Sequence, residues 1–203
     1  MLETGDIILT TVSSYFNRLF IPGHFGHCAL VFGRGLKSYL RNYFMDPTKV
    51  MIFYNSRLRD MYSTIGNFIQ QHNDTDYYAI NYTMSGPIFQ LVDEIVKDRS
   101  YLFIRSSHIE DDQQKYDFMK YLQCEIMEYM FLQYCVFPIN IELETYTYCF
   151  KAVFDIQYKT HKALNLPIKI EPVQFLQLDW ILSTSFFPDF YIIGGDVSPE
   201  LLC

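Results

Sequence analysis

The amino-acid sequence predicts an α+β fold with a small antiparallel sheet. The chain has 203 residues, half of them hydrophobic, which suits one folded domain over residues 1–203. Short β-branched and aromatic runs come first and longer stretches with helical spacing follow, an order typical of α+β proteins. The runs indicate strands at Asp6–Thr10, His27–Phe32, Val50–Tyr54 and Ser100–Arg105.

Apolar residues recur at helical spacing in four further stretches. The helices are expected at Ser13–Phe20, at Pro87–Val96, from Asp112 to about Tyr134, and from about Tyr148 to Leu164. Asp111 or Asp112 supplies the N-cap of the third helix, and Thr145 or Thr147 supplies that of the fourth.

Two regions fit neither pattern. The stretch from about Ser56 to Gly86 is polar and rich in turn residues, and we expect it to be an excursion from the core. The stretch from about Pro167 to Cys203 predicts a C-terminal extension of short mixed elements, with a turn at Gly194-Gly195.

The charge balance argues against nucleic-acid binding. The chain has 16 Lys and Arg against 23 Asp and Glu, a net charge of −7. Its densest basic spot is Arg57-Leu58-Arg59. A protein that neutralises phosphates needs a surface rich in Lys and Arg, so we expect no nucleic-acid partner.

The cysteines and the N-terminus indicate a cytoplasmic protein that is not secreted. The five cysteines form no CxxC pair and are odd in number, which is typical of free thiols in a reducing compartment. Met1–Asp6 carries two acids and lacks the basic region of a signal peptide. The uncharged stretch Tyr77–Val92 contains Gly86 and Pro87 and is shorter than the ~20 apolar residues of a transmembrane helix, so no such segment is expected.

Cys149 and His27 are the strongest candidates for chemistry. Cys149 falls in the first turn of a predicted helix, where the helix dipole lowers the pKa of a thiol. His27 opens a predicted buried strand, and an imidazole beside a thiol acts as general base and acid. A third polar group normally orients such an imidazole, and Asn55, at the end of a predicted strand, offers its side-chain oxygen.

Simpler interpretations of the same residues stay open at this point. A free cysteine is often a packing residue, a histidine before a strand is often structural, and Asn55 suits a turn. The segment His24-x-x-His27-Cys28 does not predict a metal site, because positions i and i+3 of an extended segment face opposite sides. We expect neither a metal nor another cofactor.

The order of short motifs along the chain resembles the circularly permuted NlpC-type papain-like superfamily. The motifs are GDIILT, SSYFNRLF, GHFGHCALVFG, YLFIR and YTYCFKAVFD, and their most specific points are Gly5-Asp6, His27 and Tyr148-Cys149. This superfamily includes YiiX-like proteins and relatives of lecithin:retinol acyltransferase, and TYCFKAVFDIQYK looks particularly like the permuted NlpC-like proteins of poxviruses. The resemblance covers most of residues 4–165. It implies a permuted papain-like fold whose small antiparallel sheet packs against helices, including the one that starts at the nucleophile.

The resemblance also implies roles for single residues. Cys149 would be the nucleophile, His27 the base, and Asn55 the third polar residue, in the chain order His, polar, Cys. A shift of the strand by one residue would replace Asn55 by a sequence neighbour. His24 is a rival to His27, but the HCALVF run favours His27 as the residue at which the strand starts.

The residues around Cys149 depart from the bacterial members of the superfamily. Phe150 and Lys151 follow the cysteine, where those members often have a small residue and then an acid. We expect Tyr148 and Lys151 to bind substrate, with Lys151 favouring the thiolate or an anionic substrate group.

The resemblance finally implies a function. The protein would be a viral cysteine hydrolase or acyltransferase of the host cytoplasm, a virulence or host-interaction factor that attacks an amide, ester or thioester carbonyl. Its substrate would be a small-molecule, lipid-acyl or peptide-like compound. The alternative is a catalytically silent papain-like scaffold that binds a host protein.

Overall fold

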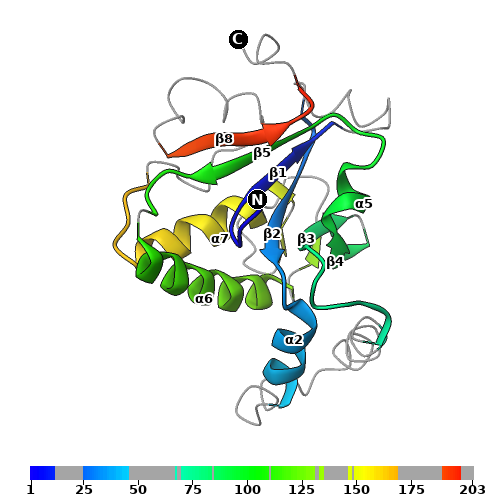
Figure 1. Ribbon diagram of the computed structural model, residues 1–203, viewed down its shortest axis with the longest axis horizontal. Coiled ribbons are helices and arrows are strands. Elements are labelled where there is room, and N and C mark those ends of the chain that lie inside the picture. Colours follow the sequence, from blue (N-terminus) through cyan, green and yellow to red (C-terminus); the bar gives the residue numbers. More distant parts are fainter. Residues whose placement is uncertain are drawn as a thin grey trace.

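The protein is an α+β fold built on one antiparallel sheet, as the sequence predicted (Figure 1). The computed structural model describes residues 1–11, 25–45, 67, 70–83, 85–109, 111–130, 133–134, 146–147, 149–168 and 189–197. Six strands of this part of the chain form the sheet in the order β4-β3-β2-β1-β5-β8. Their bounds are β1 Ile7–Thr10, β2 His27–Gly33, β3 Tyr78–Thr83, β4 Gly86–Leu91, β5 Tyr101–Ser106 and β8 Phe190–Gly195.

Four helices and one small strand pair complete the described elements. The helices are α2 Leu36–Met45, α5 Val92–Val96, α6 Asp112–Tyr129 and α7 Cys149–Ala163, and the pair is β6 Gln133–Tyr134 with β7 Tyr146–Thr147. None of these described helices has the length and apolar character to cross a membrane.

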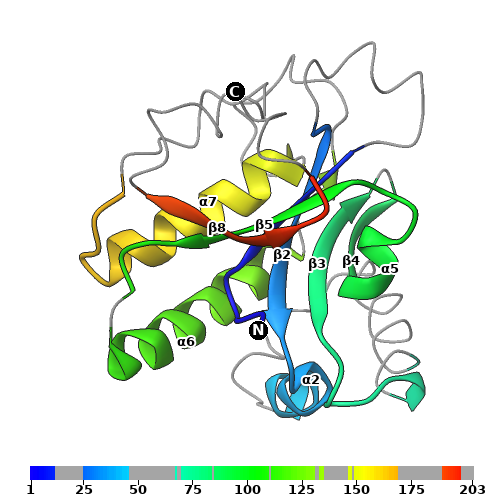
Figure 2. The same cartoon turned by 45° about the horizontal axis from the view of Figure 1, so that its top comes forward.

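Strand alternation divides the core between the two faces of the sheet. One face packs against α2, α6 and α7, and α6 and α7 lie side by side beneath it (Figures 1 and 2). The strand residues on that face include Ile7, Leu9, Cys28, Leu30 and Ile80. The opposite face carries a smaller cluster that includes Ile8, Ala29 and Val31 and packs against α5. Apolar side chains thus cover both faces of the sheet, which leaves its two ends for polar side chains.

Several predicted elements are confirmed. The strands expected at Asp6–Thr10, His27–Phe32 and Ser100–Arg105 are β1, β2 and β5. The helix expected after Asp111 is α6, and Asp111 caps it by accepting a hydrogen bond from the Gln114 N–H at 2.7 Å. The helix expected from about Tyr148 is α7. The predicted helix Ser13–Phe20 and strand Val50–Tyr54 lie outside the described residues.

The prediction that residues 56–86 leave the core is wrong for β3. This strand lies in the sheet between β2 and β4, and Tyr78, Ile80 and Tyr82 are buried against the helices. The alternation of these residues is that of a strand. Turn residues precede this strand, and the polar Asn81 interrupts its apolar residues, so the sequence pattern suggested a loop.

The predicted helix Pro87–Val96 is also wrong in its first half. Residues 86–91 form β4, and only Val92–Val96 are helical. Within the described sheet β4 is an edge strand that pairs with β3 alone, and an edge tolerates a proline such as Pro87 because proline has no N–H to donate. The predicted end of the next helix, at about Tyr134, is wrong too. Helix α6 ends at Tyr129, and Gln133–Tyr134 pair with β7 as a strand.

The predicted turn at Gly194-Gly195 is wrong as well, because both glycines lie within β8. Gly195 has a φ of +153°, and a Cβ there would lie 2.6 Å from the Tyr101 carbonyl oxygen. Glycine therefore allows β8 to approach β5 closely at this point. The C-terminal region contributes an edge strand to the main sheet.

Candidate functional site

Cys149 is the first residue of α7 and is 4% exposed. Packing of α7 against β2 and α6 holds its N-terminus against the sheet. The first N–H groups of a helix have no partner within the helix, and the positive end of the helix dipole lies there. The position of Cys149 therefore favours a negative charge on its sulfur.

His27 is the first residue of β2 and meets Cys149 at one end of the sheet. Its imidazole lies near enough to the Cys149 thiol for each group to shift the pKa of the other. Strand β2 is held on both sides by β1 and β3, so the imidazole sits on a rigid part of the fold. The structure thus brings together the two residues that the sequence singled out.

Asn81, on β3, holds the other side of the imidazole. Its Oδ1 lies 2.6 Å from His27 Nε2, and its Nδ2 donates to Gln90 Oε1 at 2.8 Å. Asn81 is buried, and its direct neighbour across the strands is Ala29, two residues beyond His27. Asn55, the residue predicted for this role, lies outside the described residues.

The contact with Asn81 sets the proton positions on the ring. An amide oxygen only accepts, so His27 Nε2 carries a hydrogen and donates it to Asn81 Oδ1. In the neutral imidazole Nδ1 then has no hydrogen, and it is the nitrogen left for Cys149. This is the tautomer that takes a proton from a thiol.

The neighbours of Cys149 lower the pKa of its thiol well below the usual value. The largest contribution is a hydrogen bond from the Cys28 thiol, and the charge and hydrogen bond of His27 act in the same direction. The backbone N–H of Cys28 also donates to the sulfur. Burial opposes these effects but does not outweigh them, so the surroundings make the thiolate more favourable than in an ordinary cysteine.

The pKa of His27 moves the opposite way. Burial disfavours the charged imidazolium, but the Cys149 charge, its hydrogen bond and the hydrogen bond to Asn81 together raise the pKa above its usual value. A lowered thiol pKa beside a raised imidazole pKa describes a thiolate–imidazolium pair. We call Cys149, His27, Cys28 and Asn81 the thiol end of the sheet.

Cys28 plays a different part from Cys149. It is fully buried, and burial, followed by its hydrogen bond to Cys149, raises the pKa of its own thiol well above the usual value. Cys28 therefore keeps its proton and donates it to the Cys149 sulfur as a hydrogen bond. Of the two adjacent thiols, Cys149 is therefore the one whose surroundings favour the thiolate.

The two residues predicted to bind substrate have different outcomes. Tyr148 lies outside the described residues, as does His24. Lys151 lies in the first turn of α7 and forms an ion pair with Asp155, whose carboxylate also accepts from the Tyr129 hydroxyl at 3.2 Å. Its ammonium group is thus already compensated, and substrate binding by Lys151 stays a prediction.

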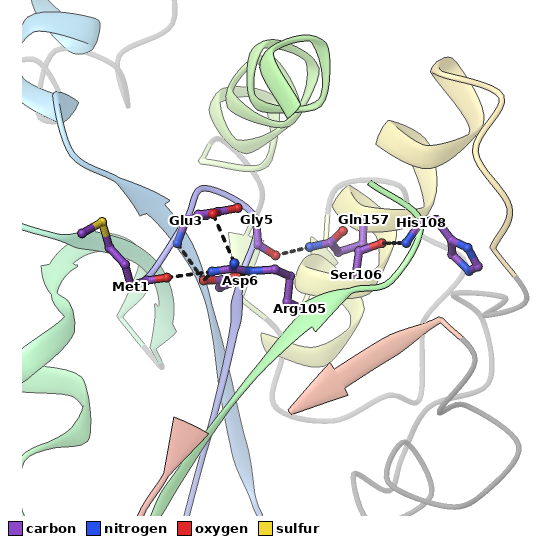
Figure 3. Close-up of polar contacts among 8 residues, drawn as sticks. All are labelled: Met1, Glu3, Gly5, Asp6, Arg105, Ser106, His108 and Gln157. Atoms are coloured by element: carbon purple, nitrogen blue, oxygen red, sulfur yellow. Dashed lines mark hydrogen bonds and ion pairs between the residues drawn. The ribbon is translucent and has the colours of Figure 1, made fainter. Parts of the chain in front are cut away.

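The opposite end of the sheet holds a second polar cluster. Arg105 contacts buried Asp6 through two nitrogens, at 2.7 and 2.8 Å, and Glu3 at 3.2 Å (Figure 3). Beside it Gln157 of α7 donates to the Gly5 carbonyl oxygen at 2.6 Å. These contacts tie the start of β1 to β5 and to α7.

His161 fixes α7 at this same end. Its Nδ1 donates to the Gln157 carbonyl oxygen at 2.7 Å, and its Nε2 accepts from the Ser106 hydroxyl at 2.8 Å. Burial lowers the pKa of His161, so the ring is neutral at pH 7. We call Asp6, Arg105, Ser106 and His161 the arginine end.

A cavity of about 600 Å³ opens at the arginine end, not at the thiol end. Its wall includes Gly5, Asp6, Arg105 and Ser106, and neither Cys149 nor His27 lines it. Arg105 in this wall is already neutralised by two carboxylates. The charges there hold the fold together, whereas the pKa shifts that favour a thiolate occur at the thiol end.

Metal binding and known relatives add no further assignment. Among the described residues, no three His, Cys, Asp or Glu side chains are grouped as metal ligands. In the comparisons with known proteins, no family model, no curated protein and no solved structure matches the chain.

Proposed function

We propose that this protein is a cysteine hydrolase or acyltransferase of the permuted papain-like type. The observation that carries the proposal is the chain of contacts from Cys149 through His27 to Asn81. It provides a nucleophile, a base in the required tautomer and a group that orients the base. These residues follow one another in the sequence as His, polar, Cys, the order of the permuted superfamily.

The proposed reaction begins from the thiolate–imidazolium pair, in which the proton of the Cys149 thiol lies on His27 Nδ1. The thiolate then attacks the carbonyl carbon of an amide, ester or thioester, and the free N–H groups at the start of α7 stabilise the oxyanion. When the intermediate collapses, His27 returns its proton to the leaving group and an acyl thioester remains on Cys149. Water, or an acceptor hydroxyl or amine, gives a proton to His27, attacks the thioester and releases the thiol.

Acyl-enzyme trapping tests the proposal. The protein is incubated with activated acyl esters, acyl thioesters and aryl amides, and intact-protein mass spectrometry with peptide mapping locates any acyl group. We expect an adduct on Cys149 in the parent and none in Cys149→Ala. His27→Ala should form the adduct about 10²- to 10⁴-fold more slowly, which is the usual contribution of a general base.

Cys124 supplies the matched control. It is an exposed free cysteine on α6, so Cys124→Ala removes a thiol without touching the thiol end. Acylation at Cys149 should be the same in this variant as in the parent. The proposal fails if no substrate class acylates Cys149, or if His27→Ala is acylated as fast as the parent. Failure of this kind would leave the silent scaffold as the function to pursue.

A further inference from the structure

Gln90, on strand β4, lies one hydrogen bond beyond Asn81. We propose that Gln90 is a positioning residue that holds the Asn81 amide in the orientation that gives His27 its catalytic tautomer. The inference rests on the proposed function, because it concerns the same thiol end. Its geometric basis is the 2.8 Å bond from Asn81 Nδ2 to Gln90 Oε1 and the 2.6 Å contact between Asn81 Oδ1 and His27 Nε2.

The orientation of the Asn81 amide matters because its two ends have opposite roles. With Oδ1 toward the ring, Nε2 keeps its hydrogen and Nδ1 is free to accept the thiol proton. A rotation by 180° would turn the NH₂ group toward Nε2, which would then have to accept. The hydrogen would move to Nδ1, and the nitrogen facing Cys149 would no longer be a base.

The strand partners of Asn81 do not choose between these orientations. Its direct partners across the two adjacent strands are Ala29 and Ile88, whose side chains have no polar atom. Asn81 is itself 6% exposed, so its amide depends on protein partners. In the arrangement observed, Gln90 Oε1 accepts from the NH₂ end of Asn81, which leaves the Asn81 oxygen for His27.

The position of Gln90 on β4 also suits a supporting role. Its direct partner in the ladder is Ala79, so the bond to Asn81 runs diagonally across two strands on one face of the sheet. Gln90 is partly exposed, and its replacement leaves no large cavity. A variant of Gln90 should therefore fold, and its properties should report on the contacts that link Gln90 through Asn81 to His27.

Two substitutions at Gln90 distinguish the effect of its acceptor oxygen from the effect of its side-chain length. Gln90→Met keeps the length and removes the acceptor, whereas Gln90→Glu keeps an acceptor oxygen. Thr83→Val is the matched control, because it removes another side-chain hydrogen bond of the same hairpin, the one to the Gly86 carbonyl oxygen at 2.9 Å.

The first readout is the tautomer of His27 in a Cys149→Ala background, where no thiolate biases the ring. Long-range ¹⁵N–¹H spectra at a pH where the ring is neutral should show the Nε2–H tautomer in this background, with Gln90→Glu and with Thr83→Val. Gln90→Met should show a substantial Nδ1–H population. An unchanged tautomer in Gln90→Met would overturn the inference.

The second readout is alkylation of Cys149 by iodoacetamide in proteins that keep the thiol. At slightly acidic pH, Gln90→Met should react about fivefold more slowly than the parent, the order of effect of one hydrogen bond, and Gln90→Glu should restore the rate. Equal rates in Gln90→Met and the parent, with the parent still showing a lowered thiol pKa, would refute the role of Gln90 alone. An ordinary thiol pKa in the parent would refute the proposed function instead.

Discussion

Helix α7 joins two ends of the sheet whose histidines behave in opposite ways. Near its N-terminus His27 has a raised pKa, and near its C-terminus His161 has a lowered one. Burial disfavours the charged form of both rings. The difference therefore comes from their partners, and it shows which end is built to carry charge.

The thiol end separates charge between two side chains. Cys149 and His27 each stabilise the charged form of the other, and Cys28 donates a further hydrogen bond to the sulfur. Such a pair suits catalysis, because the site favours the two reactive forms, the Cys149 thiolate and the His27 imidazolium.

The arginine end keeps its histidine neutral. His161 has a hydroxyl and a backbone carbonyl as partners, and two ionisable neighbours, His108 and Asp189, act on its pKa in opposite directions. Arg105 and its two carboxylate partners supply full charges at this end. This end fastens β1, β5 and α7 together, so disturbing it should change stability rather than reactivity.

The largest effect is expected from Arg105→Met. This change leaves the Asp6 carboxylate buried without its cation, which should cost about 3–5 kcal/mol of folding free energy. Urea unfolding followed by circular dichroism measures the loss. In the fraction that stays folded, alkylation of Cys149 should keep its parent rate.

The double variant Asp6→Asn with Arg105→Met is the control for this prediction. It removes the buried charge as well as its partner, and it should recover a large part of the lost stability. If Arg105→Met were as stable as the parent, the Arg105–Asp6 ion pair would not be what stabilises the arginine end.

A smaller effect should come from His161→Gln and should depend on pH. Because the pKa of His161 is lowered on folding, the stability it confers is present above the unfolded pKa of about 6.5 and is lost as pH falls toward the folded pKa. The slope from one such group is at most about 1.4 kcal/mol per pH unit. His161→Gln should flatten this part of the pH–stability curve.

His72→Gln, which removes a histidine outside the arginine end, serves as the comparison. Unfolding midpoints of His72→Gln, His161→Gln and the parent are compared between about pH 7 and pH 5. A curve for His161→Gln that is as steep as that of the parent would show that His161 does not set the acid sensitivity of this end.

The smallest effect is expected at Cys28. Cys28→Ala removes the thiol that donates to Cys149 but keeps the backbone N–H, so the pKa of Cys149 should rise and alkylation at slightly acidic pH should fall about tenfold. Cys28→Ser keeps a donor and should retain the parent rate. Identical rates in all three proteins would remove Cys28 from the account of the thiol end.

The sequence was most informative where one local pattern determined the element. β1, β2, β5, α6 and α7 each contain their own periodicity and boundary residues, and the positions of Cys149 and His27 followed from the starts of α7 and β2. No sequence pattern could show that these two starts meet, because the contact depends on how α7 packs on the sheet.

The rest of the site depends on pairing between strands. Asn81 and Gln90 fall in stretches that suggested a loop and a helix, and their contact with His27 exists only because β3 pairs with β2 and β4 pairs with β3. One local signal was available: asparagine is depleted in strands, so Asn81 between Ile80 and Tyr82 is an unusual residue. The pair Asp6–Arg105 likewise arises only when β1 and β5 pair.

The most direct test of the central claim is the pH dependence of iodoacetamide alkylation at Cys149, in the parent and in His27→Ala, with exposed Cys124 as an internal reference. Cys149 of the parent is expected to titrate well below the usual thiol pKa of about 8.5, and His27→Ala should move its pKa back toward that value. An ordinary titration of Cys149 in the parent, unchanged in His27→Ala, would contradict the thiolate–imidazolium pair and with it the proposed chemistry.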